Sequence, residues 1–392
     1  MNFDYLNMFL FNTLQEVLDQ NIEAKIETLK YNVRKMLVTK SEKPLGKIHL
    51  IDSICRLRVS YHFEHEIEEV LQHIHNNYVK NGEITFENDI FSVATLFRLL
   101  RQHGFHVLPN VFNKFKDKQG NFSERLTRDI EGMLSLYEAT HIMVHGEDIL
   151  EEALAFTTTH LEYIANQLNH PHAIQVKHSL RQALHKNLPR LEARSYISIY
   201  EKDPFHNENI LAKLDFNMLQ RLHQKEFGNV YKWWKELDMT NKLPYARDRM
   251  AESCFWALAV YFEPQYSTIR KIMMKIIITM TVVDDTYDAY GTIDELELFT
   301  KAIERLDIGL DNLPDYMKFL YRIILDLYEE IEQEMRNNGR VYALNYYVKE
   351  WQLKKYIQAY MTEARWLNNN YEPTLEDLQV FAYQKNHLVM CL

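Results

Sequence analysis

The feature that most constrains this chain is its scarcity of glycine and proline, of which its 392 residues include only 10 and 9. Turn-rich β proteins and glycine-rich nucleotide-binding folds contain more of both residues, because their tight turns depend on them. Apolar residues instead recur at helical spacing through long segments, and strand-like alternation reaches no useful length. We therefore expect an all-α fold.

Several segments show the apolar period of an amphipathic helix. Helices are expected within residues 63–77, 215–237, 313–335 and 346–367. Residues 129–156 indicate a helix, a loop and a second helix, with the break at His145 and Gly146. Glu147 and Asp148 then fall in the next first turn, where acidic side chains favour the helix dipole. Pro373 is expected to close the regular pattern.

A polar, proline-containing segment at residues 201–209, with the sequence EKDPFHNEN, interrupts the helical pattern. Connectors of this composition commonly separate domains, and the chain is long enough for two or three of them. We place the boundary here, between an N-terminal helical domain at residues 1–205 and a C-terminal domain at residues 206–392.

The net charge of −10 argues against a general nucleic-acid binder, which needs a basic surface, and it offers no attraction to an anionic membrane. The longest apolar run, residues 276–283, is far shorter than the roughly 20 residues that cross a bilayer. The N-terminus has neither the basic start of a signal peptide nor the composition of a transit peptide. Cys55, Cys254 and Cys391 form no disulfide or zinc pattern. We expect a soluble, cytoplasmic protein that binds neither nucleic acid nor membrane.

One stretch, residues 276–292 with the sequence IIITMTVVDDTYDAYGT, ends an apolar run with three aspartates. Asp284 and Asp288 are four residues apart, so on a helix they project from one face. Two carboxylates at the end of an apolar helix repel each other and resist leaving water, which favours a cation between them. Mg²⁺ suits them, because proteins hold it through one or two carboxylates with substrate phosphates completing its shell. The alternative is a negatively charged helix end on the surface.

A metal-bound phosphate needs a cationic partner, and Arg247 and Arg249 are the best candidates. They lie two residues apart, so they diverge on a regular helix, but in a loop or first turn near Pro244 both can point inward. Arginine matches phosphate oxygens two bonds at a time. The alternative is that both are ordinary surface charges.

Trp256 lies nine residues after Arg247, in the apolar segment FWALAVYFEPQY, which predicts a buried helix. Core packing is the commoner role of a single tryptophan. The other role is a π face directed at a cation, worth up to about 2 kcal/mol when desolvated. Combined with the aspartates and arginines, this role predicts a dry aromatic pocket beneath a metal–diphosphate clamp.

These features belong to a longer series of motifs. The series consists of SYHFEHEIEEVL from Ser60, GMLSLYEAT from Gly132, HGEDILEEALAFTTTHLE from His145, LDFNMLQRLHQKE from Leu214, ARDRMAESCFWALAVYFEPQYS from Ala246, VVDDTYDAYGTIDELELFTKAIERLD from Val282 and LPDYM from Leu313. A DDxxD motif alone is weak evidence, but this series in this order is specific. The chain resembles the plant terpene synthase family, most closely its cytosolic sesquiterpene synthases, from about residue 27 to about residue 377.

The resemblance implies two helical domains, an N-terminal α-barrel-like domain without chemistry and a C-terminal class I domain. It also implies roles for six residues. Asp284 and Asp288 would bind the metal, and Asp285 would be a catalytic member of the same motif. Arg247 and Arg249 would bind the departing diphosphate, and Trp256 would shield carbocations.

The implied reaction is the ionisation and cyclisation of a prenyl diphosphate with loss of diphosphate, the work of a carbon–oxygen lyase. The family uses Mg²⁺, with Mn²⁺ as a substitute, to neutralise the leaving group as a Lewis acid. Preorganised positive charge stabilises the transition state, and exclusion of water protects the cation. The lack of a plastid transit peptide favours farnesyl diphosphate as the substrate. The family expectation is a monomer.

The sequence departs from the family pattern at two places, and these departures raise alternatives to an active synthase. No arginine precedes Arg34, where the family commonly carries a tandem-arginine stretch. Residues 380–392 are expected no longer to follow the family, and the second metal motif, of Asn/Asp, Ser/Thr and Glu type, is not found after Asp288. We therefore expect a C-terminally truncated chain, and the alternative to a synthase is a catalytically inactive truncated terpene synthase-like protein. A chain-elongating prenyltransferase fits less well, because it needs a second aspartate-rich motif.

Overall fold

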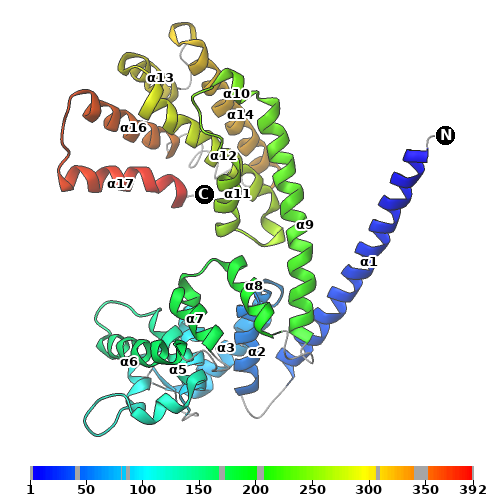
Figure 1. The fold of residues 1–392 in the computed structure, drawn as a ribbon, viewed down its shortest axis with the longest axis vertical. Coiled ribbons are helices and arrows are strands. Elements are labelled where there is room, and N and C mark those ends of the chain that lie inside the picture. Colours follow the sequence, from blue (N-terminus) through cyan, green and yellow to red (C-terminus); the bar gives the residue numbers. More distant parts are fainter. Residues whose placement is uncertain are drawn as a thin grey trace. The chain divides into compact units, whose positions relative to one another are not determined.

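A computed structural model describes residues 3–39, 45–80, 82–84, 89–166, 173–200, 207–305, 310–339 and 352–390. Nearly all of these residues lie in helices, which confirms the predicted all-α fold class (Figure 1). The strands of the described part are β1 (Val79–Lys80) and β2 (Glu83–Ile84), a short antiparallel hairpin that pairs Val79 with Ile84. None of the helices in these ranges is long and apolar enough to cross a membrane.

The chain divides into two compact units, Met1–Leu219 and Gln220–Leu392. The division falls inside one continuous helix, α9 (Asn207–Glu236). The boundary predicted from the sequence, between residues 205 and 206, lies in residues 201–206, which are outside the described residues, so it stays a prediction.

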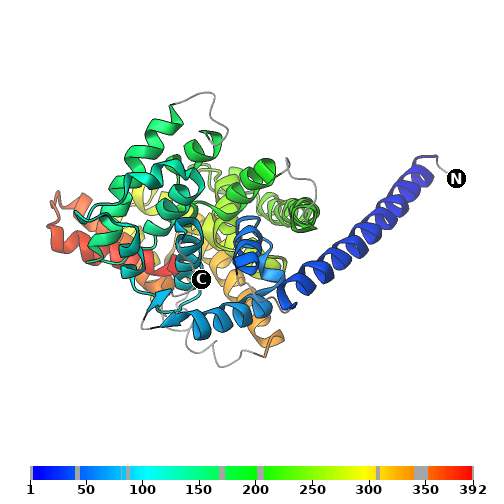
Figure 2. The same cartoon turned by 90° about the horizontal axis from the view of Figure 1, so that it is seen from below.

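The first unit holds eight further α-helices in its described part. They are α1 (Phe3–Val38), α2 (Leu45–Arg56), α3 (Glu64–Tyr78), α4 (Ile90–Gln102), α5 (Ile130–Thr140), α6 (Asp148–Ala165), α7 (Ala173–Arg181) and α8 (Pro189–Tyr200). Short 3₁₀ turns accompany them at Ser60–His62, Pro109–Phe115, Glu124–Arg128 and Leu184–Lys186. The helix α1 is unbroken in both views (Figure 2).

Helix α4 lies in the core of the first unit, with every residue from Ser92 to Leu100 buried. Its N-terminus is capped by Asp89, whose carboxylate accepts from the Ser92 N–H at 2.8 Å. The buried Arg98 on α4 forms an ion pair with Asp52, which also accepts from Arg56 Nε at 2.9 Å. Burial works against the Asp52 charge, but the two arginines hold the pKa of this carboxyl below its ordinary value.

The predicted helices of the first unit are confirmed. The segment 63–77 forms α3, and residues 129–156 form α5 and the start of α6 with a break between Thr140 and Asp148. Asp129 caps α5, because its carboxylate accepts from the Gly132 N–H at 2.8 Å.

The second unit contains the C-terminal part of α9 and seven α-helices in its described part. They are α10 (Met239–Lys242), α11 (Met250–Val260), α12 (Ser267–Asp285), α13 (Ile293–Arg305), α14 (Asp315–Asn337), α16 (Gln352–Asn368) and α17 (Leu375–Met390). The 3₁₀ turns of this unit are Pro264–Tyr266 and Leu310–Asn312. The helices predicted at 215–237 and 313–335 are confirmed as α9 and α14. The one predicted at 346–367 corresponds to α16, and residues 346–351 lie outside the described ranges.

The start of α12 is fixed by a buried ion pair. Arg270, which is fully buried, donates from Nε and Nη2 to the two oxygens of Glu226 on α9 at 2.8 and 2.7 Å. Its Nη1 donates to the Glu263 carbonyl at 2.7 Å. A bidentate pair of this kind joins α12 rigidly to α9. The apolar residues of α12 then pack against α13, α14 and α16 in one hydrophobic core.

The prediction that Pro373 closes the regular pattern is wrong, because α17 begins two residues later. Thr374 and Asp377 cap its first turn reciprocally: Asp377 accepts from the Thr374 N–H at 2.9 Å, and Thr374 Oγ1 accepts from the Asp377 N–H at 3.2 Å. Pro373 therefore stands just outside the start of a helix, where its lack of an N–H costs no hydrogen bond.

Candidate active site

The aspartate motif lies where α12 changes its winding. The α-helix ends at Asp285 and continues as a π-helical turn, Thr286–Tyr290. The Gly291 N–H donates to the Thr286 carbonyl five residues earlier, at 2.8 Å. A Cβ at Gly291 would lie 2.7 Å from a Leu296 methyl carbon and 3.2 Å from the Thr286 carbonyl oxygen, so a side chain at this position would force Leu296 to shift. Such turns occur frequently at functional sites.

The three aspartates have different surroundings. Asp285 is buried, Asp284 has a side chain that is 25% exposed, and Asp288 is exposed. Asp284 lines a cavity, and Asp288 does not belong to its lining. The motif therefore presents one carboxylate to the cavity, one to solvent and one to the protein.

Arg247 forms hydrogen bonds with Asp285, the buried aspartate of the motif. Its backbone N–H donates to Asp285 Oδ2 at 2.7 Å and its Nε donates to Oδ1 at 2.6 Å, while an Nη nitrogen reaches Asp284 at 3.1 Å. The hydrogen bond with Asp285 is the main reason why the pKa of Arg247 is raised. The sequence did not predict this contact, because nothing in the spacing of the two segments specified that they meet.

Arg249 has a different position. It is the residue before α11, partly buried, and it lines the same cavity. Its guanidinium makes no hydrogen bond or ion pair with another residue of the described part of the chain. The loop before α11 thus places both arginines at the cavity, as the sequence predicted for a loop near Pro244, and leaves Arg249 available to an anionic ligand.

Three tyrosines that the sequence reasoning missed support the π-helical turn. Thr286 donates its hydroxyl hydrogen to the Val282 carbonyl at 2.7 Å, so Tyr245 is the donor in its 2.9 Å bond with Thr286 Oγ1. The ring of Tyr245 stacks on Tyr290, with centroids 3.9 Å apart, and Tyr316 meets Tyr290 edge-on at 5.1 Å. No signal in the sequence indicated these contacts, because Tyr245 and Tyr316 are distant from Tyr290 along the chain.

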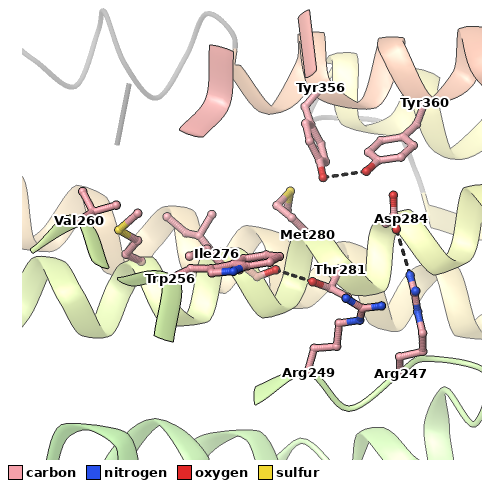
Figure 3. Close-up of a pocket in the computed structure, with 12 residues that line it drawn as sticks. Arg247, Arg249, Trp256, Val260, Ile276, Met280, Thr281, Asp284, Tyr356 and Tyr360 are labelled. Atoms are coloured by element: carbon pink, nitrogen blue, oxygen red, sulfur yellow. Dashed lines mark hydrogen bonds and ion pairs between the residues drawn. The ribbon is translucent and has the colours of Figure 1, made fainter. Parts of the chain in front are cut away.

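The cavity has a volume of about 330 Å³. It lies between α11, α12 and α16 and the arginine-bearing loop (Figure 3). Its lining residues are Arg247, Arg249, Trp256, Val260, Met273, Ile276, Ile277, Met280, Thr281, Asp284, Tyr356 and Tyr360. Cations thus lie near one end, and apolar and aromatic side chains form much of the wall.

Trp256 contributes its indole ring to this wall, but it does not lie on a buried helix as predicted. It is 47% exposed, and its neighbours Phe255 and Val260 are also about half exposed. Only Met250, Ser253 and Ala257 of α11 are buried. The segment is apolar almost all round, so its periodicity could not tell a core-facing side from a cavity-facing side.

The charges of Asp284 and Asp288 act on α16. Burial, followed by the negative charges of Asp284 and Asp288, raises the pKa of Tyr356 on α16 to about 12. In the described residues, no group of three or more His, Cys, Asp and Glu side chains converges to hold a metal ion. Two carboxylates, those of Asp284 and Asp288, fit part of an Mg²⁺ shell that phosphate oxygens and water complete. These donors therefore fit a divalent cation that binds together with a phosphate-bearing ligand.

Comparisons with known proteins agree with this arrangement. The family described as Terpene synthase, N-terminal domain matches residues 2–184, and the Terpene synthase family, metal binding domain matches residues 235–390. The chain belongs to the terpene synthase family. The second match reaches residue 390, so the prediction that residues 380–392 no longer follow the family is wrong for most of that segment.

Plant sesquiterpene synthases are among the relatives of this terpene synthase. The chain is 51% identical to a (−)-germacrene D synthase of Vitis vinifera over 93% of its own length and 65% of the relative. It is 52% identical to a sesquiterpene synthase of Santalum spicatum over 92% of its length and 64% of the relative. The chain therefore spans slightly less than two thirds of the length of these two relatives.

A solved structure of the family resembles this chain closely. Isoprene synthase from grey poplar (Populus x canescens), in complex with three Mg²⁺ ions and dimethylallyl-S-thiolodiphosphate, superposes with a TM-score of 0.83 at 36% identity. The match covers 93% of this chain and 70% of isoprene synthase. A terpene synthase fold with a metal-binding domain is thus established for the chain.

Proposed function

We propose that this terpene synthase is a sesquiterpene synthase, a lyase that ionises and cyclises farnesyl diphosphate with the help of Mg²⁺. The observation that carries the proposal is the cavity of about 330 Å³ lined jointly by Arg247, Arg249, Trp256 and Asp284. This volume lies at the lower end of the roughly 300–1,000 Å³ range of small-molecule sites. Names of plant relatives support the sesquiterpene class.

The polar end of the cavity suits a diphosphate. Arg249 has its guanidinium available, and Arg247 is half exposed while its backbone and Nε are anchored on Asp285. In our proposal both arginines bind the leaving diphosphate, and Asp284 and Asp288 hold the metal. Mg²⁺, or Mn²⁺ in its place, would act as a Lewis acid that neutralises charge on the leaving group. The fixed guanidinium charges stabilise the same charge as the carbon–oxygen bond breaks.

The apolar end of the cavity suits the hydrocarbon chain. Met273, Ile276, Ile277 and Met280 carry no hydroxyl, amine or carboxylate, and their side chains exclude water from this wall. The ring of Trp256 offers a π face to a passing positive charge, an interaction worth about 2 kcal/mol when desolvated. In the proposal this wall guides the chain of the substrate during cyclisation.

The remaining sequence expectations are part of the proposal. We propose a monomeric, cytoplasmic protein that acts on a small molecule and binds neither nucleic acid nor membranes. The names of the plant sesquiterpene synthase relatives support the choice of substrate, and the net charge of −10 is unfavourable for nucleic acid.

The test is a product assay on the full 392-residue chain with farnesyl diphosphate and Mg²⁺, read by gas chromatography and mass spectrometry. Asp284→Ala should reduce product formation at least about 100-fold, because it removes a proposed metal ligand. Asp326→Ala removes an exposed carboxylate of α14 outside the cavity and serves as the control. An active Asp284→Ala variant would contradict the site assignment. A folded wild-type chain without product would instead support the inactive alternative, and consumption of added isopentenyl diphosphate would indicate a prenyltransferase.

A further inference from the structure

Two tyrosine hydroxyls meet at the cavity wall formed by α16. Tyr356 and Tyr360 lie one helical turn apart, and their hydroxyl oxygens are 2.9 Å apart. Figure 3 shows both side chains pointing from α16 toward Asp284, on the side opposite to Arg247. Asp284 therefore lies between a tyrosine pair and an arginine.

The direction of the hydrogen bonds follows from the chemistry of the three groups. Tyr360 makes a side-chain hydrogen bond with Asp284, and both residues line the cavity. An ionised carboxylate can only accept, so Tyr360 donates its single hydroxyl hydrogen to Asp284. Tyr360 then has only acceptor sites left, and Tyr356 must be the donor in the 2.9 Å bond between the hydroxyls. The chain of donation runs from Tyr356 to Tyr360 to Asp284.

The ring and the hydroxyl of Tyr360 have separate partners. The residue is 3% exposed, and its ring packs near Tyr287 with centroids 5.9 Å apart and edge-on against Tyr356 at 4.7 Å. A phenylalanine would preserve these ring contacts. The hydroxyl alone reaches Asp284, so its removal affects the carboxylate without creating a cavity in the core.

We propose that Tyr360 is a positioning residue that orients the Asp284 carboxylate for binding a divalent cation, and that Tyr356 supports it by fixing the Tyr360 hydroxyl. The inference rests on the proposed function, in which Asp284 is a metal ligand. A ligating carboxylate is commonly held by a hydrogen bond from a neighbouring group, and loss of that group typically weakens metal binding about 10- to 100-fold. Arg247 supplies charge to Asp284 from the other side, so the tyrosine is the neutral partner that can stay in place beside a cation.

The first experiment measures Mn²⁺ binding alone to the full chain by electron paramagnetic resonance. Tyr360→Phe should weaken binding about 10- to 100-fold, and Tyr356→Phe should weaken it less, because Tyr356 acts only through Tyr360. Tyr328→Phe removes a hydroxyl from the same unit, at a half-buried α14 position outside the cavity lining, and should bind Mn²⁺ as the wild type does. Equal melting temperatures of the variants would exclude a general loss of structure.

The second experiment measures the Mg²⁺ dependence of binding of farnesyl thiodiphosphate by isothermal titration calorimetry. Tyr360→Phe should raise the half-saturating Mg²⁺ concentration by the same factor, while the affinity for the thio analogue at saturating Mg²⁺ stays within about threefold of the wild type. If Tyr360 had a role in packing alone, the half-saturating Mg²⁺ concentration and the affinity for the thio analogue would not change separately.

The outcomes separate this inference from the proposed function. If the wild type binds metal and Tyr360→Phe binds it equally well, the positioning role is wrong, whatever the analogue does. If the wild type binds metal but not the analogue, the proposed substrate is wrong, and the Mn²⁺ comparison still decides the role of Tyr360. If the folded wild type binds no metal, both the metal site and the positioning role are overturned.

Discussion

The contact between Arg247 and Asp285 yields a quantitative prediction. Asp285 is 5% exposed, and it accepts from the backbone N–H and from Nε of Arg247 and forms an ion pair with its Nη2. Replacing the arginine side chain leaves the backbone bond intact, so a double-mutant cycle measures only the side-chain part. Two charge-assisted bonds would contribute about 3–6 kcal/mol if fully buried. The Arg247 side chain is 50% exposed, however, so solvent screening should reduce their coupling energy to about 1–2 kcal/mol.

The cycle uses Arg247→Ala, Asp285→Asn and the double variant, with urea unfolding followed by tryptophan fluorescence. All five tryptophans lie in the second compact unit, so this signal reports the unit that contains the pair. The ion pair between Arg365 and Glu297, at 3.0 Å with side chains 53% and 38% exposed, is a control with an expected coupling near zero. A coupling energy below about 0.5 kcal/mol for Arg247 and Asp285, within the error of simple additivity, would refute the reasoning.

Three further predictions concern other parts of the chain. Trp256→Ala should lower the rate of product formation by up to about 30-fold, which is equivalent to about 2 kcal/mol. Trp256→Phe should lower this rate less, because it keeps an aromatic ring. Equal losses of rate in both variants would contradict a cation–π role. Gly291→Ala should destabilise the second unit by about 1–3 kcal/mol, because the added Cβ would lie 2.7 Å from Leu296. Unfolding monitored by tryptophan fluorescence measures this loss, and an unchanged midpoint would contradict the prediction. Burial lowers the pKa of His141 from 6.5 to about 4, so the unfolded chain binds more protons between these values. Stability should therefore fall as the pH falls from 6.5 to 4, by about 1 kcal/mol after allowance for partial exposure. His141→Gln should flatten this pH dependence in circular dichroism melts, and an unaltered slope would argue against it.

The sequence predicted the fold class and the helices well, because amphipathic periodicity and capping are local properties. The same locality explains the error at Pro373. Proline was interpreted as the end of a helical pattern, but the reciprocal cap of Thr374 and Asp377 makes it the flank of a new helix.

The candidate site could be predicted only as a set of residues. Four of the six predicted residues line one cavity, and Asp285 is joined to them through Arg247. The sequence could not indicate that contact, nor the approach of Tyr356 and Tyr360, because these pairings depend on how distant helices pack. It also could not predict how strongly Trp256 is exposed, since an apolar helix gives no signal that separates a wall from a core.

The π-helical turn has a consequence for how the aspartate motif should be compared between proteins. A π turn accommodates one residue more than an α-helical turn, so it is equivalent to an insertion in a regular helix. Deleting one residue between Thr286 and Tyr290 would restore uninterrupted α-helical winding and rotate the following backbone by about 100°, the angle per residue of an α-helix. Deletion of Tyr287, for example, would turn Asp288 away from its present direction and shorten the DDxxD motif by one residue. An alignment gap inside this motif therefore reports a change in the direction of the last carboxylate.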